Sequence, residues 1–185
     1  MRIISGKNKG KQLIAPAKLP VRPTTDFAKE ALFNILNNNY YFDEIMVLDL
    51  FSGTGNISYE FASRGCQNII AVDSHKGCIQ FISKIAQELD YPITSIKSDV
   101  YDFLKKTHQT FDVIFADPPY DFTLDKFDEI IQLVFENQLL NENGMLIIEH
   151  SKHTNLEEKI YFSFSKKYGG NVFSFFEIDD NISEI

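Results

Sequence analysis

The sequence predicts an α/β fold with a Rossmann-like, doubly wound sheet of seven strands that ends in an antiparallel hairpin. Short apolar runs rich in Val, Ile and Phe alternate with helical stretches, the pattern of a parallel sheet covered on both faces. A glycine turn at 52–56 separates one such run from a helix. Near the end of the chain, Gly169-Gly170 separates two aromatic-rich runs, which is a hairpin signal.

We expect the chain to begin with a short β-hairpin extension. Arg2–Gly6 and Lys11–Ala15 are predicted as two short strands joined by a glycine-flanked loop. Residues 1–22 contain six cations and no acid, although the net charge of the 185-residue chain is −8. This asymmetry divides the chain into a basic hairpin arm, residues 1–21, and an acidic domain, residues 22–185.

The acidic domain should begin with a helix, which Thr24, Thr25 or Asp26 can cap. Arg22 to Thr25 could form one wall of a ligand pocket. The remaining elements are expected in alternation, with strands near 45–51, 68–72, 93–97, 111–116 and 145–149, helices near 57–64, 76–89 and 125–137, and hairpin strands near 159–168 and 171–178.

Acidic residues at the ends of the expected strands predict an adenosine site. Asp73 follows a strand and can bind both hydroxyls of a ribose, and Asp99 follows the next strand, beside an expected adenine. A dinucleotide fold usually has a third glycine where this chain has Ser58, and Asp49 would repel a pyrophosphate but stabilise a cationic ligand. The predicted cofactor is therefore S-adenosyl-L-methionine.

The most informative motif is Asp117-Pro118-Pro119-Tyr120, directly after a buried-strand run. Proline cannot donate to a sheet ladder, so the strand stops there. A carboxylate, two carbonyl groups and an aromatic face remain, which suits a planar base held by its exocyclic amino group. By itself, the motif is equally compatible with an ordinary Pro-Pro loop.

Composition excludes several classes of protein. There is no apolar run long enough to span a membrane and no signal-peptide pattern, so we expect one soluble, cytoplasmic domain. Cys66 and Cys78 are expected as reduced thiols. No metal is expected, because His150 and His153 have no Cys partner and no Glu between them.

The basic arm is a candidate phosphate clamp for RNA, although a solvated arm without function is the simpler interpretation. Lys166–Tyr168 could extend the same face. The cations expected to contact RNA are Arg2, Lys7, Lys9, Lys11 and Arg22.

With these motifs in view, the chain resembles the RsmD family of small-subunit rRNA guanine-N2 methyltransferases. The resemblance covers nearly the whole chain, from Arg2 to about Phe176. Its motifs are R-I-I-S-G at Arg2–Gly6, R-P-T-T-D-x-x-K-E-x-L-F-N at Arg22–Asn34, L-D-L-F-S-G-T-G at Leu48–Gly55, A-S-R-G at Ala62–Gly65, V-D-S at Val72–Ser74, D-V-I-F-A-D-P-P-Y at Asp112–Tyr120 and K-x-Y-G at Lys166–Gly169. Ser58 departs from the family, whose members commonly have glycine there, so helix packing could shift.

The resemblance implies methyl transfer from S-adenosyl-L-methionine to the N2 amino group of a guanine in 16S rRNA, at position 966 in the family's type reaction. The acceptor would be the small ribosomal subunit or its precursor, and the enzyme a monomer. Residues 22–185 would form the S-adenosylmethionine-dependent methyltransferase domain. The implied catalytic residues are Asp117, Pro118, Pro119 and Tyr120, and the implied cofactor residues are Thr24, Asp49, Phe51, Gly53, Gly55, Asp73, Ser74, Asp99 and Val100.

Alternatives remain at this stage. An adenine-N6 methyltransferase acting on DNA or RNA would share the Asp117–Tyr120 motif but would not explain the basic arm. A dinucleotide oxidoreductase would need a pyrophosphate turn that the chain lacks. A non-catalytic RNA-binding subunit would not need the intact Asp117–Tyr120 motif. Free rRNA and an assembled particle are both open as substrates.

Overall fold

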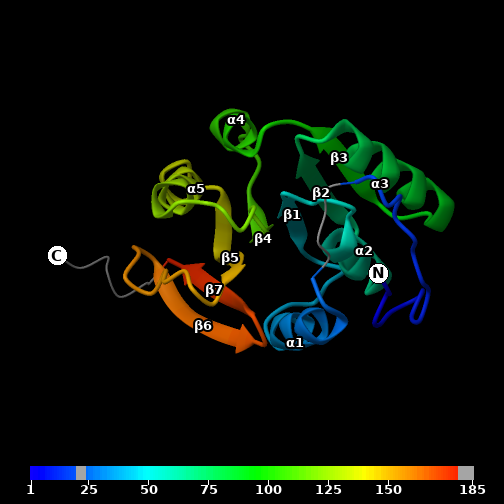
Figure 1. The fold of residues 1–185 in the computed structure, drawn as a ribbon, viewed down its shortest axis with the longest axis horizontal. Coiled ribbons are helices and arrows are strands. Elements are labelled where there is room, and N and C mark those ends of the chain that lie inside the picture. Colours follow the sequence, from blue (N-terminus) through cyan, green and yellow to red (C-terminus); the bar gives the residue numbers. More distant parts are fainter. Residues whose placement is uncertain (20–23, 179–185) are drawn as a thin grey trace.

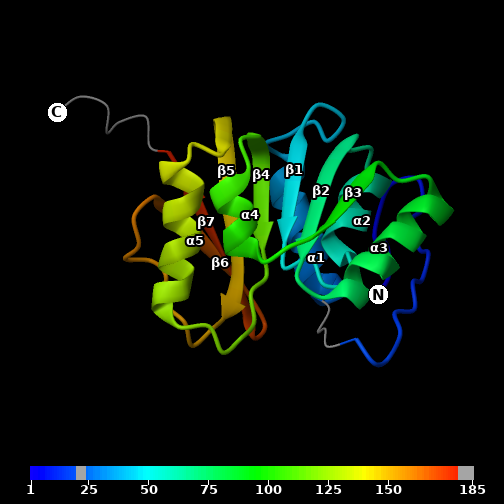
Figure 2. The ribbon, with the colours of Figure 1, turned by 90° about the horizontal axis from the view of Figure 1, so that it is seen from above.

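The computed structural model describes residues 1–19 and 24–178. A seven-stranded sheet forms the middle layer (Figures 1 and 2). One face packs against α1 (Asp26–Asn37), α2 (Asn56–Ser63) and α3 (Lys76–Leu89), and the other packs against α4 (Val100–Lys106) and α5 (Leu124–Glu136).

The strand order is β3-β2-β1-β4-β5-β7-β6. The first five strands are parallel, and β7 runs antiparallel to both β5 and β6. The predicted doubly wound sheet with a final antiparallel hairpin is therefore confirmed. The strands are β1 (Met46–Leu50), β2 (Asn68–Asp73), β3 (Ile93–Lys97), β4 (Phe111–Ala116), β5 (Leu140–Ser151), β6 (Phe162–Tyr168) and β7 (Asn171–Glu177).

Alternation along the central strands produces two hydrophobic clusters, one on each face of the sheet. In β1, Val47 points toward α1 and α2, whereas Leu48 and Leu50 point toward α4 and α5. A strand buried on both faces appears as a continuous apolar run in the sequence, which is why these strands could be predicted. Their rigidity fixes the positions of the loops at their carboxyl ends.

The prediction of an N-terminal β-hairpin is wrong. Within the described residues, the segment forms one isolated antiparallel bridge, between Arg2 and Gln12. Backbone hydrogen bonds join Met1 to Leu13 and Ile3 to Gly10 and Lys11, but the pairing ends at Ile3, and the amide groups of Ile4 and Ser5 donate to the Glu60 carboxylate, at 2.8 and 3.0 Å. A distant side chain on α2 therefore replaces the strand partner that the local pattern suggested.

The N-terminal segment packs closely on the rest of the molecule. Ile3 and Leu13 are buried in the same hydrophobic cluster as α1 and α2. Glu60, fully buried, accepts hydrogen bonds from that segment and pairs with Lys29 at 3.3 Å and Arg64 at 2.8 Å. Packing and charge together hold the segment against α2.

Two further differences concern an additional helix and the start of a strand. Helix α4 was not expected, and it has only seven residues. Strand β5 is twelve residues long and begins at Leu140, before the Asn143-Gly144 turn that was expected to precede it. Within the described ranges, no helix has both the length and the apolar character needed to cross a membrane.

Candidate active site

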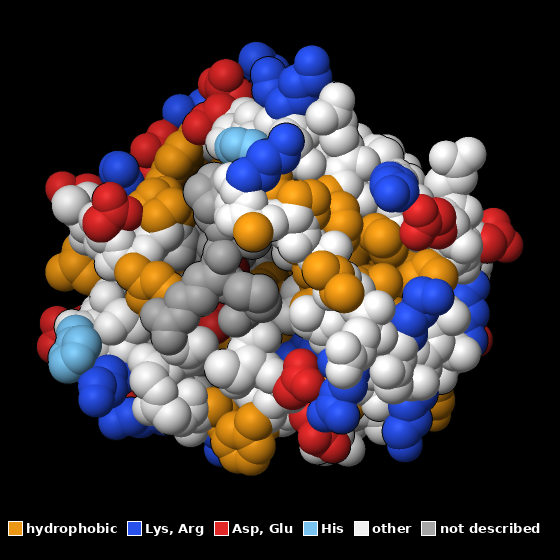
Figure 3. Space-filling view, turned by 45° about the vertical axis from the view of Figure 1, so that its right-hand side comes forward, with side chains coloured by type: hydrophobic (Ala, Val, Ile, Leu, Met, Phe, Trp, Pro, Cys, Tyr) orange, Lys and Arg blue, Asp and Glu red, His pale blue; other side chains and the backbone are white. Residues whose placement is uncertain are grey.

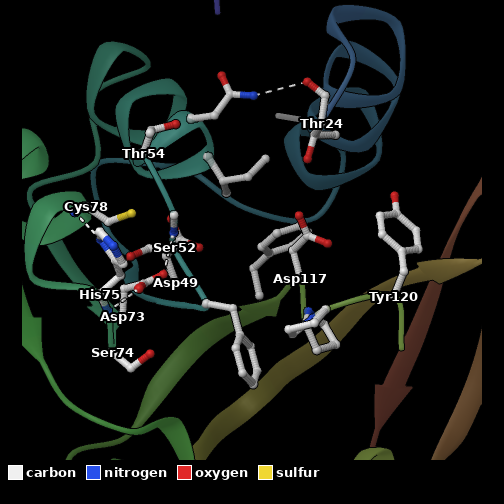
Figure 4. Close-up of a pocket in the computed structure, with 17 residues that line it drawn as sticks. Thr24, Asp49, Ser52, Thr54, Asp73, Ser74, His75, Cys78, Asp117 and Tyr120 are labelled. Carbon is white, nitrogen blue, oxygen red and sulfur yellow. Dashed lines mark hydrogen bonds between the residues drawn. The ribbon is translucent and has the colours of Figure 1, made fainter. Parts of the chain in front are cut away.

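A cavity of about 410 Å³ opens at the carboxyl ends of β1, β2 and β4. Strand β1 lies between β2 and β4, so the chain order reverses there, which is where open α/β sheets bind ligands. The volume lies within the range of small-molecule sites. Its lining comprises Thr24, Asp49, Phe51, Ser52, Gly53, Thr54, Asn56, Ile57, Asp73, Ser74, His75, Cys78, Phe115, Asp117, Pro118, Pro119 and Tyr120 (Figure 4).

The turn after β1 has a conformation that explains its glycines. Gly53 and Gly55 have φ values of 52° and 83°. A Cβ on Gly55 would lie 2.8 Å from the Tyr59 ring, so this glycine is needed for both its φ and its close packing. Phe51 has a φ of 55°, an uncommon backbone conformation for a side chain of that size.

Asp49 is a buried carboxylate, 2% exposed, at the floor of the cavity. Its Oδ2 accepts hydrogen bonds from the Ser58 amide, at 3.1 Å, and the Ser58 hydroxyl, at 2.6 Å. Burial raises the pKa of the Asp49 carboxyl to about 7, although the Ser58 bonds oppose the shift. Ser58, at the position where a glycine was expected, is thus a hydrogen-bond donor to Asp49.

Asp73 lies on the same side of the cavity as Asp49, with Ser74, His75 and Cys78 (Figure 4). Its Oδ2 accepts from the Gly53 amide at 2.8 Å, and its Oδ1 accepts from the His75 amide at 2.7 Å. Two carboxylate oxygens offer about four acceptor positions, so two neighbouring hydroxyl groups could still be bound. These bonds also fix the carboxylate to the glycine turn.

The Asp117–Tyr120 loop forms the opposite wall. Asp117 is half-buried at the end of β4, where its amide donates to the Leu50 carbonyl at 3.4 Å. Pro118 is buried, whereas Tyr120 is 44% exposed. Figure 4 shows Asp117 between the glycine turn and Tyr120, with Thr24 across from both.

Thr24 is held from two sides. Its hydroxyl donates to Glu149 Oε2 at 2.8 Å, and its carbonyl accepts from Asn56 Nδ2 at 3.2 Å. Asn56 Oδ1 in turn accepts from the buried Lys29 ammonium at 2.9 Å. The approach to α1, which Thr25 caps, is therefore fixed to the start of α2.

Ten of the predicted site residues come together in this cavity: Thr24, Asp49, Phe51, Gly53, Asp73, Ser74, Asp117, Pro118, Pro119 and Tyr120. Of the described residues predicted to bind the cofactor, Gly55, Asp99 and Val100 are outside the lining. Asp99 caps α4 by accepting from Tyr101 and Asp102, and Val100 is buried in the second hydrophobic cluster. Their roles in binding stay predictions.

Several lining residues were missed. Ser52, Thr54 and Asn56 belong to the glycine turn, whose motif could have indicated them. Cys78 and Phe115 come from α3 and β4, and only the packing of these elements shows that they line the cavity. The buried Ser52 Oγ has no hydrogen-bond partner in the described part of the chain, which leaves it available to a ligand.

The residues present fit S-adenosyl-L-methionine. A buried carboxylate at Asp49 suits a cationic group, and Asp73 suits a ribose. The unpaired Ser52 hydroxyl and the Gly53 turn lie between them. Asp117 and Tyr120 line the other side of the same cavity, so a second, planar ligand could contact the loop (Figure 4).

Four of the predicted RNA-contacting cations, Arg2, Lys7, Lys9 and Lys11, are exposed, but they differ in their contacts. Arg2 pairs with Asp26 at 3.0 Å, and Lys7 donates to the Asp90 carbonyl at 3.1 Å. On the face in Figure 3, Lys and Arg side chains are scattered and interspersed with acidic ones, without forming one continuous basic patch. Arg22 lies outside the described residues. RNA contact by Arg2, Lys7, Lys9 and Lys11 stays a prediction.

The sheet order, the glycine turn and the cavity at the switch point define a Rossmann-like α/β domain of the methyltransferase class. Residues 1–177 match the family described as Conserved hypothetical protein 95. The chain belongs to this family, that of the RsmD methyltransferases.

Two relatives illustrate the match. The chain is 36% identical, over 86% of its length and 88% of the relative's, to the Putative rRNA methyltransferase YlbH of Bacillus subtilis. It is 32% identical to the Ribosomal RNA small subunit methyltransferase D of Haemophilus influenzae, over 82% and 79% of the two chains.

Solved structures agree with the fold. The putative methyltransferase yhhF from Escherichia coli superposes with a TM-score of 0.80 at 25% identity, over 95% of this chain and 96% of that one. The Thermus thermophilus 16S rRNA N2 G1207 methyltransferase RsmC, in complex with AdoMet and guanosine, has a TM-score of 0.69 at 20% identity. That match covers 86% of this chain and 45% of RsmC.

Proposed function

We propose that this protein is an S-adenosylmethionine-dependent rRNA methyltransferase that modifies the exocyclic N2 of a guanine in 16S rRNA. The observation that carries the proposal is the two-part cavity. One part, at Asp49, Ser52 and Asp73, suits the cofactor, and the other presents Asp117 beside an exposed Tyr120.

The chemistry required of the loop follows from the acceptor. The lone pair of the guanine amino nitrogen is delocalised into the ring, so this group is a poor nucleophile. The Asp117 carboxylate and the Pro118 carbonyl would accept its two N–H bonds and favour a nitrogen whose lone pair faces the methyl group. Catalysis would then consist of orientation and stabilisation of the positive charge that develops on nitrogen.

When bound, S-adenosylmethionine would supply the methyl group: an N–C bond would form as the S–C bond breaks, leaving a neutral thioether. The nitrogen must then lose a proton, which Asp117 or water can accept. Tyr120 would stack on the base after it has left its helix or loop. Asp49 would stabilise the cationic end of the cofactor, and Asp73 would bind its ribose.

The comparisons support both parts of this proposal. Relatives that cover most of the chain are named as rRNA methyltransferases, and one of them as acting on the small subunit. RsmC has a similar fold and was solved with AdoMet and guanosine. The assembled small subunit or its precursor is the preferred substrate, because a small acidic domain has little surface for selecting one guanine unaided.

The test is a methyl-transfer assay with labelled S-adenosylmethionine and four acceptors: unmethylated small subunits, free 16S rRNA, tRNA and DNA. Digestion should yield labelled N2-methylguanosine from the subunit or its rRNA. Label in N6-methyladenosine would instead support the adenine-N6 class, with which the Asp-Pro-Pro-Tyr motif is shared. Cofactor binding without transfer to any acceptor would contradict the proposal.

A further inference from the structure

A buried carboxylate outside the cavity connects two of its walls. Glu149, near the end of β5, is 1% exposed. Its Oε2 accepts from the Thr24 hydroxyl at 2.8 Å, and its Oε1 accepts from Asn171 Nδ2 at 2.6 Å. A buried carboxylate is costly unless donors surround it, so these bonds strongly favour one arrangement of the side chains.

Asn171 continues the connection to the Asp117–Tyr120 loop. It is the first residue of β7, directly after the Gly169-Gly170 turn, and is buried. Its Oδ1 accepts from the Tyr120 hydroxyl at 3.2 Å. One line of hydrogen bonds therefore joins Tyr120, Asn171, Glu149 and Thr24, and we call this line the bridge.

The residue type at 171 matters for this connection. Asparagine has both an acceptor and a donor, so it can accept from a phenol and donate to a carboxylate simultaneously. Aspartate would place a second carboxylate against Glu149, and an apolar side chain would serve neither neighbour. The hairpin β6–β7 thus contributes a bridge between loops that belong to other parts of the sheet.

We propose that Glu149 and Asn171 are positioning residues that hold Tyr120 and Thr24 at a fixed separation and so shape the opening through which the target base reaches Asp117. The inference rests on the proposed function, because it assigns the opening to a base. Neither residue lines the cavity, so both act through the side chains they hold.

The alternative is that the bridge stabilises only the fold. A double-mutant cycle distinguishes this role from the positioning of Tyr120. Tyr120→Phe removes one hydroxyl from an exposed ring, and Asn171→Ala removes its partner. Each should lower kcat/KM for the rRNA substrate by roughly tenfold, with a Kd for S-adenosylmethionine within about twofold of wild type. The double variant should be little worse than Asn171→Ala alone, because that substitution already removes the contact of the Tyr120 hydroxyl.

Ser174→Ala is the matched control. Ser174 is also buried in β7, and its hydroxyl lies 2.8 Å from His150 Nε2 and not against the Asp117–Tyr120 loop. This variant should lose stability without losing activity at a temperature where it is folded. Additive effects in the cycle, or an equal loss of activity in Ser174→Ala, would overturn the inference.

A second measurement does not depend on the reaction. Hydrogen exchange of the segment 117–122 should be faster in Asn171→Ala than in wild type, and unchanged in Ser174→Ala. Unchanged exchange in Asn171→Ala would overturn the bridge even if the enzyme methylates guanine. Faster exchange in a protein that methylates no guanine would leave the bridge standing and reject the proposed function.

Discussion

At the scale of single residues, the two carboxylates at opposite ends of the cavity have separable tasks. Asp73 is bonded to the glycine turn and faces the half that suits the cofactor. Asp117 follows β4 and faces the half that suits a base. Binding and transfer should therefore respond differently to the loss of each.

We expect Asp117→Ala to bind S-adenosylmethionine like wild type but to lose methyl transfer by about 10²–10³-fold, because an acceptor for the amino group is gone. Asp73→Ala should raise the Kd for the cofactor by about tenfold or more, because charge-assisted hydrogen bonds to the ribose are lost. Calorimetry and a single-turnover assay measure the two effects. Wild-type transfer by both variants would show that the site is misassigned.

Asp49 predicts a pH dependence of cofactor binding. Burial raises the pKa of this carboxyl to about 7, with the nearby charge of Asp73 adding to the shift, so in the free protein Asp49 is protonated below that pH. A cationic ligand favours the ionised form and releases the proton. Affinity should therefore rise roughly fivefold from pH 6 to pH 7 and less than twofold from pH 7 to pH 8.

Calorimetric titrations across this range, with Asp49→Asn as comparison, test the assignment. The variant should bind more weakly and lose the dependence. His75 also lines the cavity, and His75→Asn, which keeps a capping side chain, isolates any contribution of the imidazole. A wild-type affinity that is flat from pH 6 to pH 8 would rule out a cation next to Asp49.

At the scale of elements, Gly55 in the glycine turn can be compared with Gly10, which has the same backbone conformation. Gly55 and Gly10 have nearly equal φ values, 83° and 84°, but a Cβ on Gly55 would meet the Tyr59 ring whereas one on Gly10 would meet nothing within 4 Å among the described residues. Gly10→Ala should therefore cost only the backbone strain, about 1–2 kcal/mol.

Gly55→Ala should cost more than Gly10→Ala and should also weaken cofactor binding, because the turn must move to relieve the clash. Thermal unfolding and calorimetry compare the two variants. Equal losses of stability, with unchanged affinity in both, would show that the packing of Gly55 on Tyr59 is unimportant.

Sequence patterns predicted those elements whose determinants are local. The bounds of α3 and β3 follow from their periodicity, and the glycine turn indicated its own residues. Helix α4 was missed because seven residues give too short a periodic signal, and its cap, Asp99, had been assigned to adenine. The predicted N-terminal hairpin is reduced to one bridge, and the next amide groups, of Ile4 and Ser5, bind Glu60, far along the chain, which no local pattern indicates.

The same distinction applies to the site. Asp117–Tyr120 could be found because the motif is contiguous. The bridge through Glu149 and Asn171 could not, because it depends on the register of β7 on β5 and on the approach of Thr24, neither of which leaves a local pattern. Buried polar contacts between distant elements are visible only after the elements have packed.

At the scale of the whole molecule, the net charge of −8 makes the cations of the N-terminal segment, which has no acid in residues 1–22, important for RNA binding. Lys9→Gln with Lys11→Gln should weaken rRNA binding and reduce the slope of log affinity against log salt by roughly 1.4, the value for two phosphate contacts on single-stranded RNA. Lys106→Gln, on α4 and therefore on the other side of the sheet, is the control. A salt slope in the Lys9→Gln, Lys11→Gln variant equal to that of the wild type would exclude the N-terminal segment from RNA contact.

The buried contacts of Lys29 fix the distance between the N-terminal segment and the cavity. This ammonium donates to the Arg2 carbonyl at 2.6 Å and to Asn56, which lines the cavity, while Glu60 secures the next amides of the N-terminal segment. These contacts connect the N-terminal segment, with Lys7, Lys9 and Lys11, to the wall of the cavity. An RNA held by these lysines would present to Asp117 only the nucleotide at a fixed distance from them, so a guanine would be selected by its separation from the bound phosphates.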